Sequence, residues 1–262
     1  MINPIRHINV IRYISPLREG GSLPAIAEGD DGFLYVLKFR GAGQGLKALI
    51  ADFIGGELAR ALGLLMPEMV YAHLQEGFGR TEPDEEIQDL LKASTGLNLG
   101  VHFLSGALTF DPEVHDMDAR TASKIVWLDA LLMNIDRTAR NTNMLVWNKE
   151  IWLIDHGASM YFHHNWDSLE NLVHSPFAMI KEHVLLPRAS ELEAVAAEGL
   201  AALNPELIRS VIDALPEEWL QLSEPERSMM EIKEGYISFL TQRLLHSDKF
   251  VKQALDARLA LI

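Results

Sequence analysis

The sequence has 262 residues, 48% of them hydrophobic and 23% charged, which is typical of a folded globular domain and unlike a disordered chain. Its 23 Lys and Arg residues against 37 Asp and Glu residues give a formal net charge of −14, so we expect no nucleic-acid partner. The complete lack of cysteine excludes disulfides, thiolate nucleophiles and cysteine-ligated metals.

The chain begins with alternating apolar and basic residues over 1–12, without the continuous apolar core of a signal peptide. Nowhere do about 18 consecutive apolar residues occur, so we expect neither a membrane-spanning segment nor a membrane partner. Together with the lack of cysteine, this pattern favours a protein of the reducing cytoplasm.

The first hundred residues are expected to combine strands and helices. The aromatic and β-branched run 33–39 predicts a strand, and the Gly-Asp-Asp-Gly sequence at 29–32 predicts a hairpin turn before it. Apolar residues at helical spacing predict a helix over 47–62, and Gly63 ends it. A short apolar stretch follows at 69–74. This part of the chain is therefore expected to be rich in β-structure.

Within the first hundred residues, the charged run 80–86 predicts an exposed loop, and 101–104, just after them, predicts a strand or a connector between the halves.

From Asp118 onward the chain is expected to be mainly helical. Asp118 can cap a helix that runs to about Asn134. Three further helices are predicted from capping patterns at Ser190 with Glu193, at Asn204 with Pro205, and at Ser223 with Pro225 and Glu226. We therefore expect an α+β fold with a β-rich lobe at 1–100 and a mainly helical lobe at 101–262.

A small hairpin is predicted between the β-rich front and the helical rear of the chain. The apolar runs 144–147 and 151–154 form two short strands, and Asn148 with Lys149 supplies the turn. Since the strands of a hairpin run side by side, the residues that flank it must emerge at the same open end.

Three polar residues stand at that open end. Folding the hairpin about its turn places Asn141 and Asp155 nearly opposite each other, with Asp136 in the loop just before. An amide oxygen and a carboxylate are hard-oxygen ligands suited to Mg²⁺ that carries phosphate oxygens. The second carboxylate can then orient or deprotonate an acceptor hydroxyl. Any one of these residues alone is more simply explained as a turn former, but the ordered set predicts an ATP-dependent and Mg²⁺-dependent phosphotransferase.

The same residues carry a resemblance to a known family. The sequence from Asp136-Arg137 to Asn141, followed by Ile154-Asp155-His156-Gly157, resembles the catalytic and metal-binding loops of HipA-like kinases. It is more distantly similar to phosphatidylinositol 3/4-kinases. Thr138 stands where these families often have His, and His156 stands where many have Phe. The resemblance covers about 16–162 and implies a two-lobed, protein-kinase-like fold.

The resemblance implies a cation on the nucleotide phosphates, delivered from a strand near the N-terminus. Lys38 fits, because strand alternation places it on one face with Leu34 and Val36, while Phe39 points away. A buried lysine needs an acidic partner, and the helix that follows offers Glu57 and Asp52. Glu57 is the favoured candidate, and Asp52 is the alternative on a face of small residues.

The resemblance also implies two nucleotide contacts made by backbone groups. A flexible loop at Gly20, Gly21 and Ser22 would cover the phosphates, although an ordinary turn explains the two glycines equally well. A connector over 99–106 would contact the adenine near His102 and Phe103.

Other functions remain open from the sequence alone. A relative without catalytic activity could bind nucleotide as a regulatory module. The histidines His156, His163 and His164 could belong to a metal-dependent hydrolase, although packing explains them more simply. Asp129, inside the helix before the catalytic loop, is expected to hydrogen-bond the loop backbone and hold Asp136. The acceptor, a protein Ser or Thr or a small molecule, is not indicated by any motif.

Overall fold

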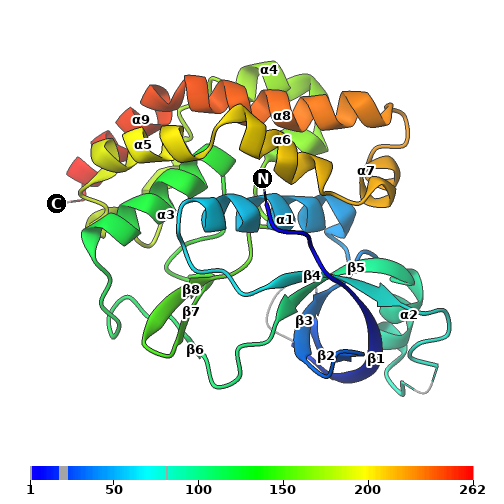
Figure 1. Ribbon diagram of the computed structural model, residues 1–262. Helices are drawn as coiled ribbons and strands as arrows, with labels where there is room; N and C mark the ends of the chain where they lie inside the picture. The colour runs from blue at the N-terminus through cyan, green and yellow to red at the C-terminus, as the bar shows by residue number, and fades with distance from the viewer. Residues whose placement is uncertain (1, 18–22, 81, 262) are drawn as a thin grey trace.

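The computed structural model describes residues 2–17, 23–80 and 82–261. Its first part is a five-stranded barrel with the strand order β1-β2-β3-β5-β4, closed by parallel pairing of β1 with β4 (Figure 1). The strands are β1 (His7–Pro16), β2 (Ala25–Gly29), β3 (Leu34–Lys38), β4 (Met69–Leu74) and β5 (Gly96–His102). All other neighbouring pairs in the barrel are antiparallel.

The hairpin predicted around 29–32 is confirmed. Strands β2 and β3 are antiparallel neighbours, and Glu28 pairs with Leu34 across the turn. Gly32 has φ +80°, a left-handed conformation that glycine adopts without steric cost. The Asp31 carboxylate accepts the Phe33 N–H at 3.1 Å and so closes the turn.

The charged run 80–86 was expected to be an exposed loop; residues 80 and 82–84 lie outside helices and strands, but Glu85 and Glu86 begin helix α2 (Glu85–Ala93). Asp84 is the N-cap, and its carboxylate accepts the backbone N–H groups of the next turn. Ile87 and Leu91, one helical turn apart, are buried in the barrel core. The prediction missed the start of α2, because the charged residues at its beginning obscured the helical spacing of the two apolar residues that follow.

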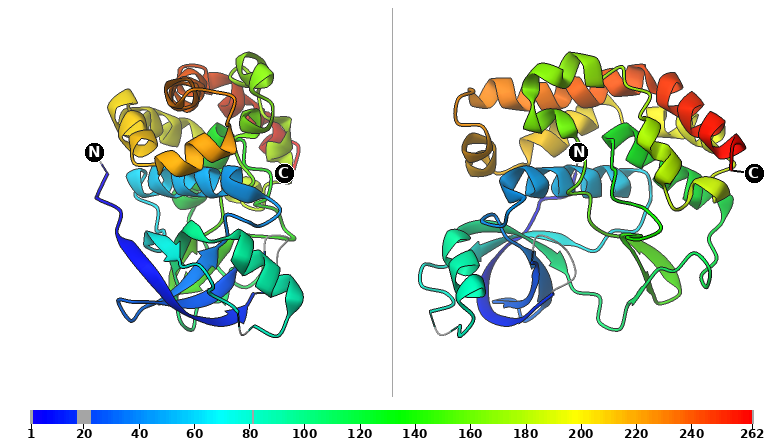
Figure 2. Two further views of the ribbon diagram at one scale, coloured as in Figure 1. Left: turned by 90° about the vertical axis from the view of Figure 1, so that its right-hand side faces the viewer. Right: turned by 180° about the vertical axis from the view of Figure 1, so that it is seen from behind.

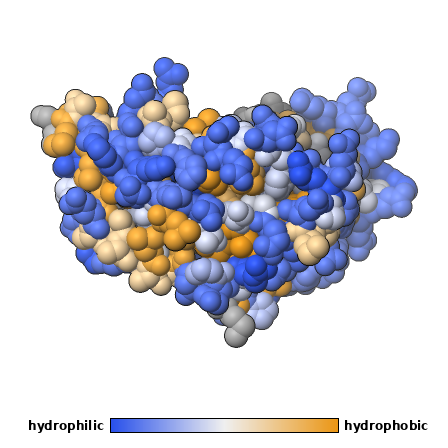
Figure 3. Space-filling view, turned by 90° about the horizontal axis from the view of Figure 1, so that it is seen from above, coloured by the Kyte–Doolittle hydropathy of each residue, from blue (hydrophilic) through white to orange (hydrophobic). Residues whose placement is uncertain are grey.

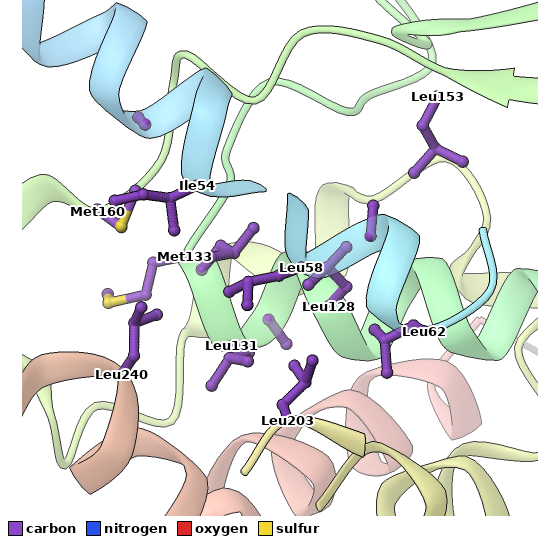
Figure 4. Packing of buried hydrophobic residues seen from close by; sticks show 14 of the residues in the cluster. Ile54, Leu58, Leu62, Leu128, Leu131, Met133, Leu153, Met160, Leu203 and Leu240 are labelled. Atoms are coloured by element: carbon purple, nitrogen blue, oxygen red, sulfur yellow. The ribbon is translucent and has the colours of Figure 1, made fainter. Parts of the chain in front are cut away.

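Helix α1 (Gly45–Ala61) is the central layer of the molecule. It lies between the barrel and the C-terminal helices, as the views in Figures 1 and 2 agree. Apolar side chains of α1, among them Ile54 and Leu58, pack toward Leu128 and Leu131 of helix α3 (Ala119–Leu132) (Figure 4). One continuous hydrophobic core therefore joins α1 to the helical region.

A second, three-stranded sheet has the order β6-β7-β8, with β7 in the middle. Its strands are β6 (Leu108–Thr109), which precedes α3, and β7 (Met144–Trp147) and β8 (Glu150–Leu153), which follow it. The later helices are α4 (Leu169–Leu172), α5 (Leu192–Ala202), α6 (Pro205–Asp213), α7 (Glu217–Ser223), α8 (Met229–Leu245) and α9 (Ser247–Leu259). Short 3₁₀ turns η1 (Tyr161–His164), η2 (Trp166–Ser168), η3 (Ala178–Glu182) and η4 (Leu186–Arg188) connect them.

Two of the predicted helix caps are confirmed. The Asp118 carboxylate accepts the Thr121 N–H at 2.8 Å at the start of α3. The Asn204 side chain accepts the Leu207 N–H at 2.9 Å at the start of α6. Both side chains satisfy a backbone donor that has no partner inside the helix.

The other two capping predictions were wrong. Glu191 rather than Ser190 precedes α5, and it makes no side-chain capping bond. Ser223 ends α7 instead of starting the next helix, and the capping box of α8 is formed by Ser228 and Glu231. The competing pattern lay five residues further along, where both halves of the box are present.

The surface over the C-terminal helices mixes hydrophilic residues with separate apolar patches (Figure 3). Among the described residues, no helix combines the length and apolar character needed to cross a membrane.

Candidate active site

The predicted hairpin is confirmed as β7 and β8. Met144 pairs with Leu153 and Trp147 pairs with Glu150, so the second strand is 150–153 instead of the predicted 151–154. Asn148 and Lys149 have φ +51° and +68°. Two left-handed residues in a two-residue loop match the right-handed twist of the strands.

The pairing continues beyond the strands at the open end, where Ile154 N–H donates to the Asn143 carbonyl at 3.0 Å. The chain segments that carry Asn141 and Asp155 therefore leave the hairpin side by side. Both residues line one cleft of about 1240 Å³ together with Asp136 and Lys38. The structure thus brings together the residues that the sequence pattern selected.

Asp136 is held by two amides of its own loop. Its Oδ2 accepts the side-chain N–H groups of Asn141 at 2.8 Å and Asn143 at 3.1 Å. Within the described chain, its Oδ1 has no hydrogen-bond partner. One carboxylate oxygen is therefore anchored while the other is available to a hydroxyl group in the cleft.

A buried arginine, which sequence reasoning did not single out, organises the loop behind Asp136. The Arg137 side chain is fully buried, and its Nε donates to Asp129 Oδ2 at 2.5 Å. Its other nitrogens contact the Asn143 carbonyl and, at 3.2 Å, His156 Nε2. The adjacent Asp-Arg pair in the motif was the signal that could have identified it.

Asp129 supports the loop through side chains, which corrects the expectation that it would bond the loop backbone. Its carboxylate binds Arg137, the Asn134 amide at 2.9 Å and His183 Nε2 at 2.9 Å. Asn134 Oδ1 in turn accepts the Asp136 N–H at 3.1 Å. Burial acts to raise the pKa of Asp129, but the Arg137 guanidinium and the His183 bond outweigh it and lower the pKa. The carboxylate is therefore an ionised anchor.

Lys38 reaches the site from the end of β3. Its Nζ lies 2.6 Å from Asp52 Oδ2 and 3.1 Å from Asp155 Oδ1. Burial acts to lower the pKa of Lys38, but the two carboxylates outweigh it and raise the pKa, so the ammonium stays charged. Val36 lines the same cleft, and Phe39 is buried in the barrel, as strand alternation predicted.

The favoured partner Glu57 was the wrong choice for Lys38. Glu57 pairs instead with Arg60, one turn later in α1. Burial raises the pKa of Glu57, although the Arg60 guanidinium opposes the shift. The apolar residues around Glu57 belong to the core between α1 and the C-terminal helices, so this face of α1 points away from Lys38.

Asp52 connects two parts of the site. While Oδ2 binds Lys38, Oδ1 accepts the backbone N–H of His156 at 2.6 Å. Asp52 thus fixes the segment directly after Asp155. Asp155 itself has φ +55°, and its Oδ1 accepts the Gly157 N–H at 3.1 Å.

On the expectation from the sequence that this cleft binds ATP, replacing Asp52 by Asn should lower kcat/KM for ATP by about 10–100-fold, a typical effect of removing a residue that orients a ligand-binding group. The amide can still accept the His156 N–H, but it no longer neutralises Lys38. Glu57→Gln in the same helix is the matched control and should change kcat/KM less than threefold, since Glu57 contacts Arg60. Equal losses in the two variants would contradict the assignment.

Small residues of α1 let the helix approach the segment after Asp155. A Cβ atom on Gly55 would lie 2.5 Å from the Cβ of His156, closer than side-chain atoms tolerate. On Gly43, just before the helix, a Cβ atom would meet nothing within 4 Å.

We expect Gly55→Ala to lower the free energy of unfolding by about 1–3 kcal/mol, because forcing an extra methyl group into a packed site shifts its neighbours. Urea denaturation followed by circular dichroism measures the change. Gly43→Ala is the control and should stay within about 0.5 kcal/mol of the wild type. An unchanged unfolding midpoint for Gly55→Ala would show that α1 does not pack this tightly against His156.

The histidines do not assemble a metal site. His156 contacts Arg137, whereas His163 Nδ1 lies 3.0 Å from the Tyr236 hydroxyl. Burial lowers the pKa of His156 to about 4, so it is neutral and acts as a packing and hydrogen-bonding group. Among the residues described, no three His, Asp or Glu side chains are grouped to hold a metal. The hydrolase hypothesis finds no support in this geometry.

The donor chemistry of Asn141 and Asp155 fits a divalent cation. Asn141 donates its amide N–H to Asp136, which leaves its Oδ1 as an acceptor toward the cleft. The second oxygen of Asp155, Oδ2, has no protein partner in the described part of the chain. Partial burial acts to raise the pKa of Asp155, but Lys38 and the Gly157 N–H outweigh it and lower the pKa. The site therefore offers an ionised carboxylate and a neutral amide oxygen, both hard ligands.

Two further nucleotide contacts were predicted from the sequence, and the structure describes one of them. His102 and Phe103 line the cleft, but their N–H groups already donate to the carbonyls of Glu68 and Leu34, each at 2.8 Å. These two N–H groups are thus committed to the sheet. The loop at Gly20, Gly21 and Ser22 lies outside the described residues.

Comparisons with known proteins bear on the family and the fold of the chain. The family model described as HipA-like kinase matches residues 10–254. The fold is similar to that of the Helicobacter pylori proinflammatory kinase CtkA, with a TM-score of 0.60 and 12% identity over 98% of this chain and 99% of that one. A Golgi casein kinase with Mn/ADP bound aligns with a TM-score of 0.46 and 13% identity over 99% of this chain and 75% of that one. No curated protein sequence matches the chain.

Proposed function

The chain belongs to the HipA-like kinase family, and from this we propose that it transfers the γ-phosphate of ATP to a hydroxyl group, with Mg²⁺ as its cofactor. The observation that carries the proposal is the convergence of Asp136, Asn141, Asp155 and Lys38 on one cleft. Phosphoryl transfer needs these parts, because catalysis depends on positioning and on neutralising charge rather than on covalent chemistry.

Asp136 would accept the proton of the acceptor hydroxyl. Its Oδ2 is fixed by the amides of Asn141 and Asn143, so Oδ1 is presented to the cleft in a defined direction. General-base assistance of this kind requires a carboxylate within hydrogen-bond reach of the attacking oxygen. A pre-ordered carboxylate spends no energy on reorientation during the reaction.

Lys38 and the metal ligands would hold the nucleotide phosphates. Asn141 through Oδ1 and Asp155 through its carboxylate would bind Mg²⁺. When bound, Mg²⁺ neutralises the negative charge of the phosphates. Lys38, kept charged between Asp52 and Asp155, supplies a fixed positive charge beside Oδ1 of the Asp155 carboxylate.

The adenine would lie in the apolar part of the cleft. Val36, Met69 and Val101 from three barrel strands line it. Since the N–H groups of His102 and Phe103 are paired in the sheet, an adenine would meet carbonyl groups there or N–H groups further along the connector. In this proposal 1–100 and 101–262 act as the two lobes of a protein-kinase-like fold. Gly20, Gly21 and Ser22 would cover the phosphates.

The acceptor would be a protein Ser or Thr or a hydroxylated small molecule, and the location would be the cytoplasm. The alternative within the same family is a nucleotide-binding module without turnover. Incubation of the purified chain with γ-³²P-ATP and Mg²⁺ distinguishes them, because water can serve as a slow acceptor when no other is present. Release or transfer of labelled phosphate supports the kinase. Tight ATP binding without any turnover, including with mixed protein substrates, would favour the module.

A further inference from the structure

A tight turn in the catalytic loop presents a second cation to the cleft. Thr138 N–H donates to the Asn141 carbonyl at 2.9 Å, and Asn141 N–H donates back to Thr138 at 3.2 Å. These reciprocal bonds leave Ala139 and Arg140 at the tip of a two-residue turn. Both tip residues line the cleft, and Arg140 is exposed.

Both flanks of this turn are fixed. The Asn141 amide is bound to Asp136, so the turn cannot move independently of the proposed base. The backbone of Thr138 forms an isolated antiparallel β-bridge with that of His183, and the His183 imidazole is bound to the buried Asp129. The backbone of Arg140 is therefore held in a fixed position relative to Asp136, while its side chain is free to reach a ligand.

Arg140 differs from the other cation of the cleft in having no carboxylate partner. Lys38 is shared between Asp52 and Asp155. Within the chain that the structure describes, the Arg140 guanidinium makes neither a hydrogen bond nor an ion pair. An arginine that lines an acidic cleft without a partner is available for an anionic ligand.

The charge of the cleft shows why such a cation is needed. Among the described residues that line it, five are carboxylates and two are lysine or arginine side chains: Asp52, Asp111, Glu113, Asp136 and Asp155 against Lys38 and Arg140. The terminal phosphate of ATP must approach Asp136 closely for transfer, and these two groups repel each other. Among the described residues of the lining, Arg140 is the cation without a carboxylate partner, whereas Lys38 is shared between Asp52 and Asp155.

We propose, on the basis of the function proposed above, that Arg140 donates hydrogen bonds to the phosphoryl group while it is transferred. In that step the bond between the γ-phosphorus and the β–γ bridging oxygen breaks, and ADP leaves with its electron pair. The acceptor oxygen forms the new bond to phosphorus, and its proton passes to Asp136. Arg140 exchanges no proton; it stabilises charge on the non-bridging oxygens, and a guanidinium can contact two of them at once.

The test compares ADP binding with binding of ADP plus aluminium fluoride, a mimic of the transferring phosphoryl group, both with Mg²⁺. For Arg140→Gln we expect affinity for the mimic complex to fall about 100-fold and affinity for ADP alone to change less than threefold, since losing one such donor typically costs 10²–10³-fold. Arg140→Lys should recover part of the loss, because an ammonium restores charge but not the two-point contact. Arg80→Gln, which removes an arginine outside the cleft, should change neither affinity.

The outcomes separate this inference from the function on which it rests. If the wild type binds neither ADP nor the mimic complex, the proposed function fails and the role of Arg140 fails with it. If the wild type binds both and Arg140→Gln weakens them equally or not at all, the kinase proposal stands and the role of Arg140 is wrong. A loss confined to the KM of an acidic acceptor would also overturn it. A wild-type thermal unfolding midpoint for Arg140→Gln confirms that the variant is folded.

Discussion

Replacement of Asp136 by Asn is expected to lower the rate of phosphate transfer by about 10²–10⁴-fold while ATP affinity changes less than threefold. The magnitude is that of removing a general base. Asparagine has nearly the same shape, and its amide oxygen can still accept the bonds from Asn141 and Asn143. The loop should therefore keep its conformation. Turnover of γ-³²P-ATP and direct titration of ATP measure the two quantities separately.

A matched control for this variant is Asp116→Asn. The Asp116 side chain is fully exposed, and its contact with Arg188 is 4.0 Å long. This control removes the same charge from the protein without touching the cleft, so its turnover should equal that of the wild type. Wild-type turnover in Asp136→Asn would remove Asp136 from the proposed chemistry.

The second large effect is expected for Asp155→Asn, which should weaken Mg²⁺-dependent ATP binding by about 100-fold, equivalent to about 2.8 kcal/mol. The substitution keeps the backbone, because asparagine tolerates the left-handed conformation that Asp155 adopts at φ +55°. The amide oxygen can also still accept the Gly157 N–H. What is lost is the negative charge that would bind Mg²⁺ and that Lys38 contacts.

The metal dependence of this result decides its meaning. ATP affinity should be measured by isothermal titration with Mg²⁺ and again with EDTA. The loss in Asp155→Asn should appear with Mg²⁺ and largely disappear with EDTA, since the carboxylate then has no cation to bind. Equal losses under both conditions would mean that Asp155 acts on the fold and not through the metal.

The hairpin explains why the centre of the site could be predicted from the sequence. Two apolar runs separated by Asn148 and Lys149 allow one register, and that register fixes where the flanking polar residues emerge. The prediction was accurate to one residue in the second strand. Local patterns of this kind carry enough information because the pairing is short-range, the widest pair being Asn143 with Ile154, eleven residues apart along the chain.

The partner of Lys38 could not be predicted in the same way. The choice between Asp52 and Glu57 depends on how α1 is rotated against the segment after Asp155, which lies about a hundred residues away in the sequence. That rotation is set by close packing, since a Cβ atom on Gly55 would meet His156 and one on Gly157 would meet Ala48. Small residues on a helix face indicate a close approach but not what approaches.

The buried support of the catalytic loop could be predicted only in part, because Asp129 was expected to hold the loop but its side-chain partners were not identified. Asp129, Arg137 and His183 form one hydrogen-bonded group, although 54 residues separate the first from the last. Each alone resembles an ordinary surface residue by type. Only their burial together shows that charge and hydrogen bonding are satisfied inside the core. The role of Arg140 could not be predicted from the sequence either. What distinguishes this residue is that its guanidinium has no partner within the described chain, and a sequence pattern does not show this.

The most direct test of the central claim is a crystal structure with Mg²⁺ and a non-hydrolysable ATP analogue. We predict one Mg²⁺ ion bound by Asn141 Oδ1 and an Asp155 carboxylate oxygen, each about 2.1 Å away. The terminal phosphate should lie on the same side as the free Oδ1 of Asp136. A nucleotide bound outside this cleft, or an ion that contacts neither Asn141 nor Asp155, would contradict the proposed active site.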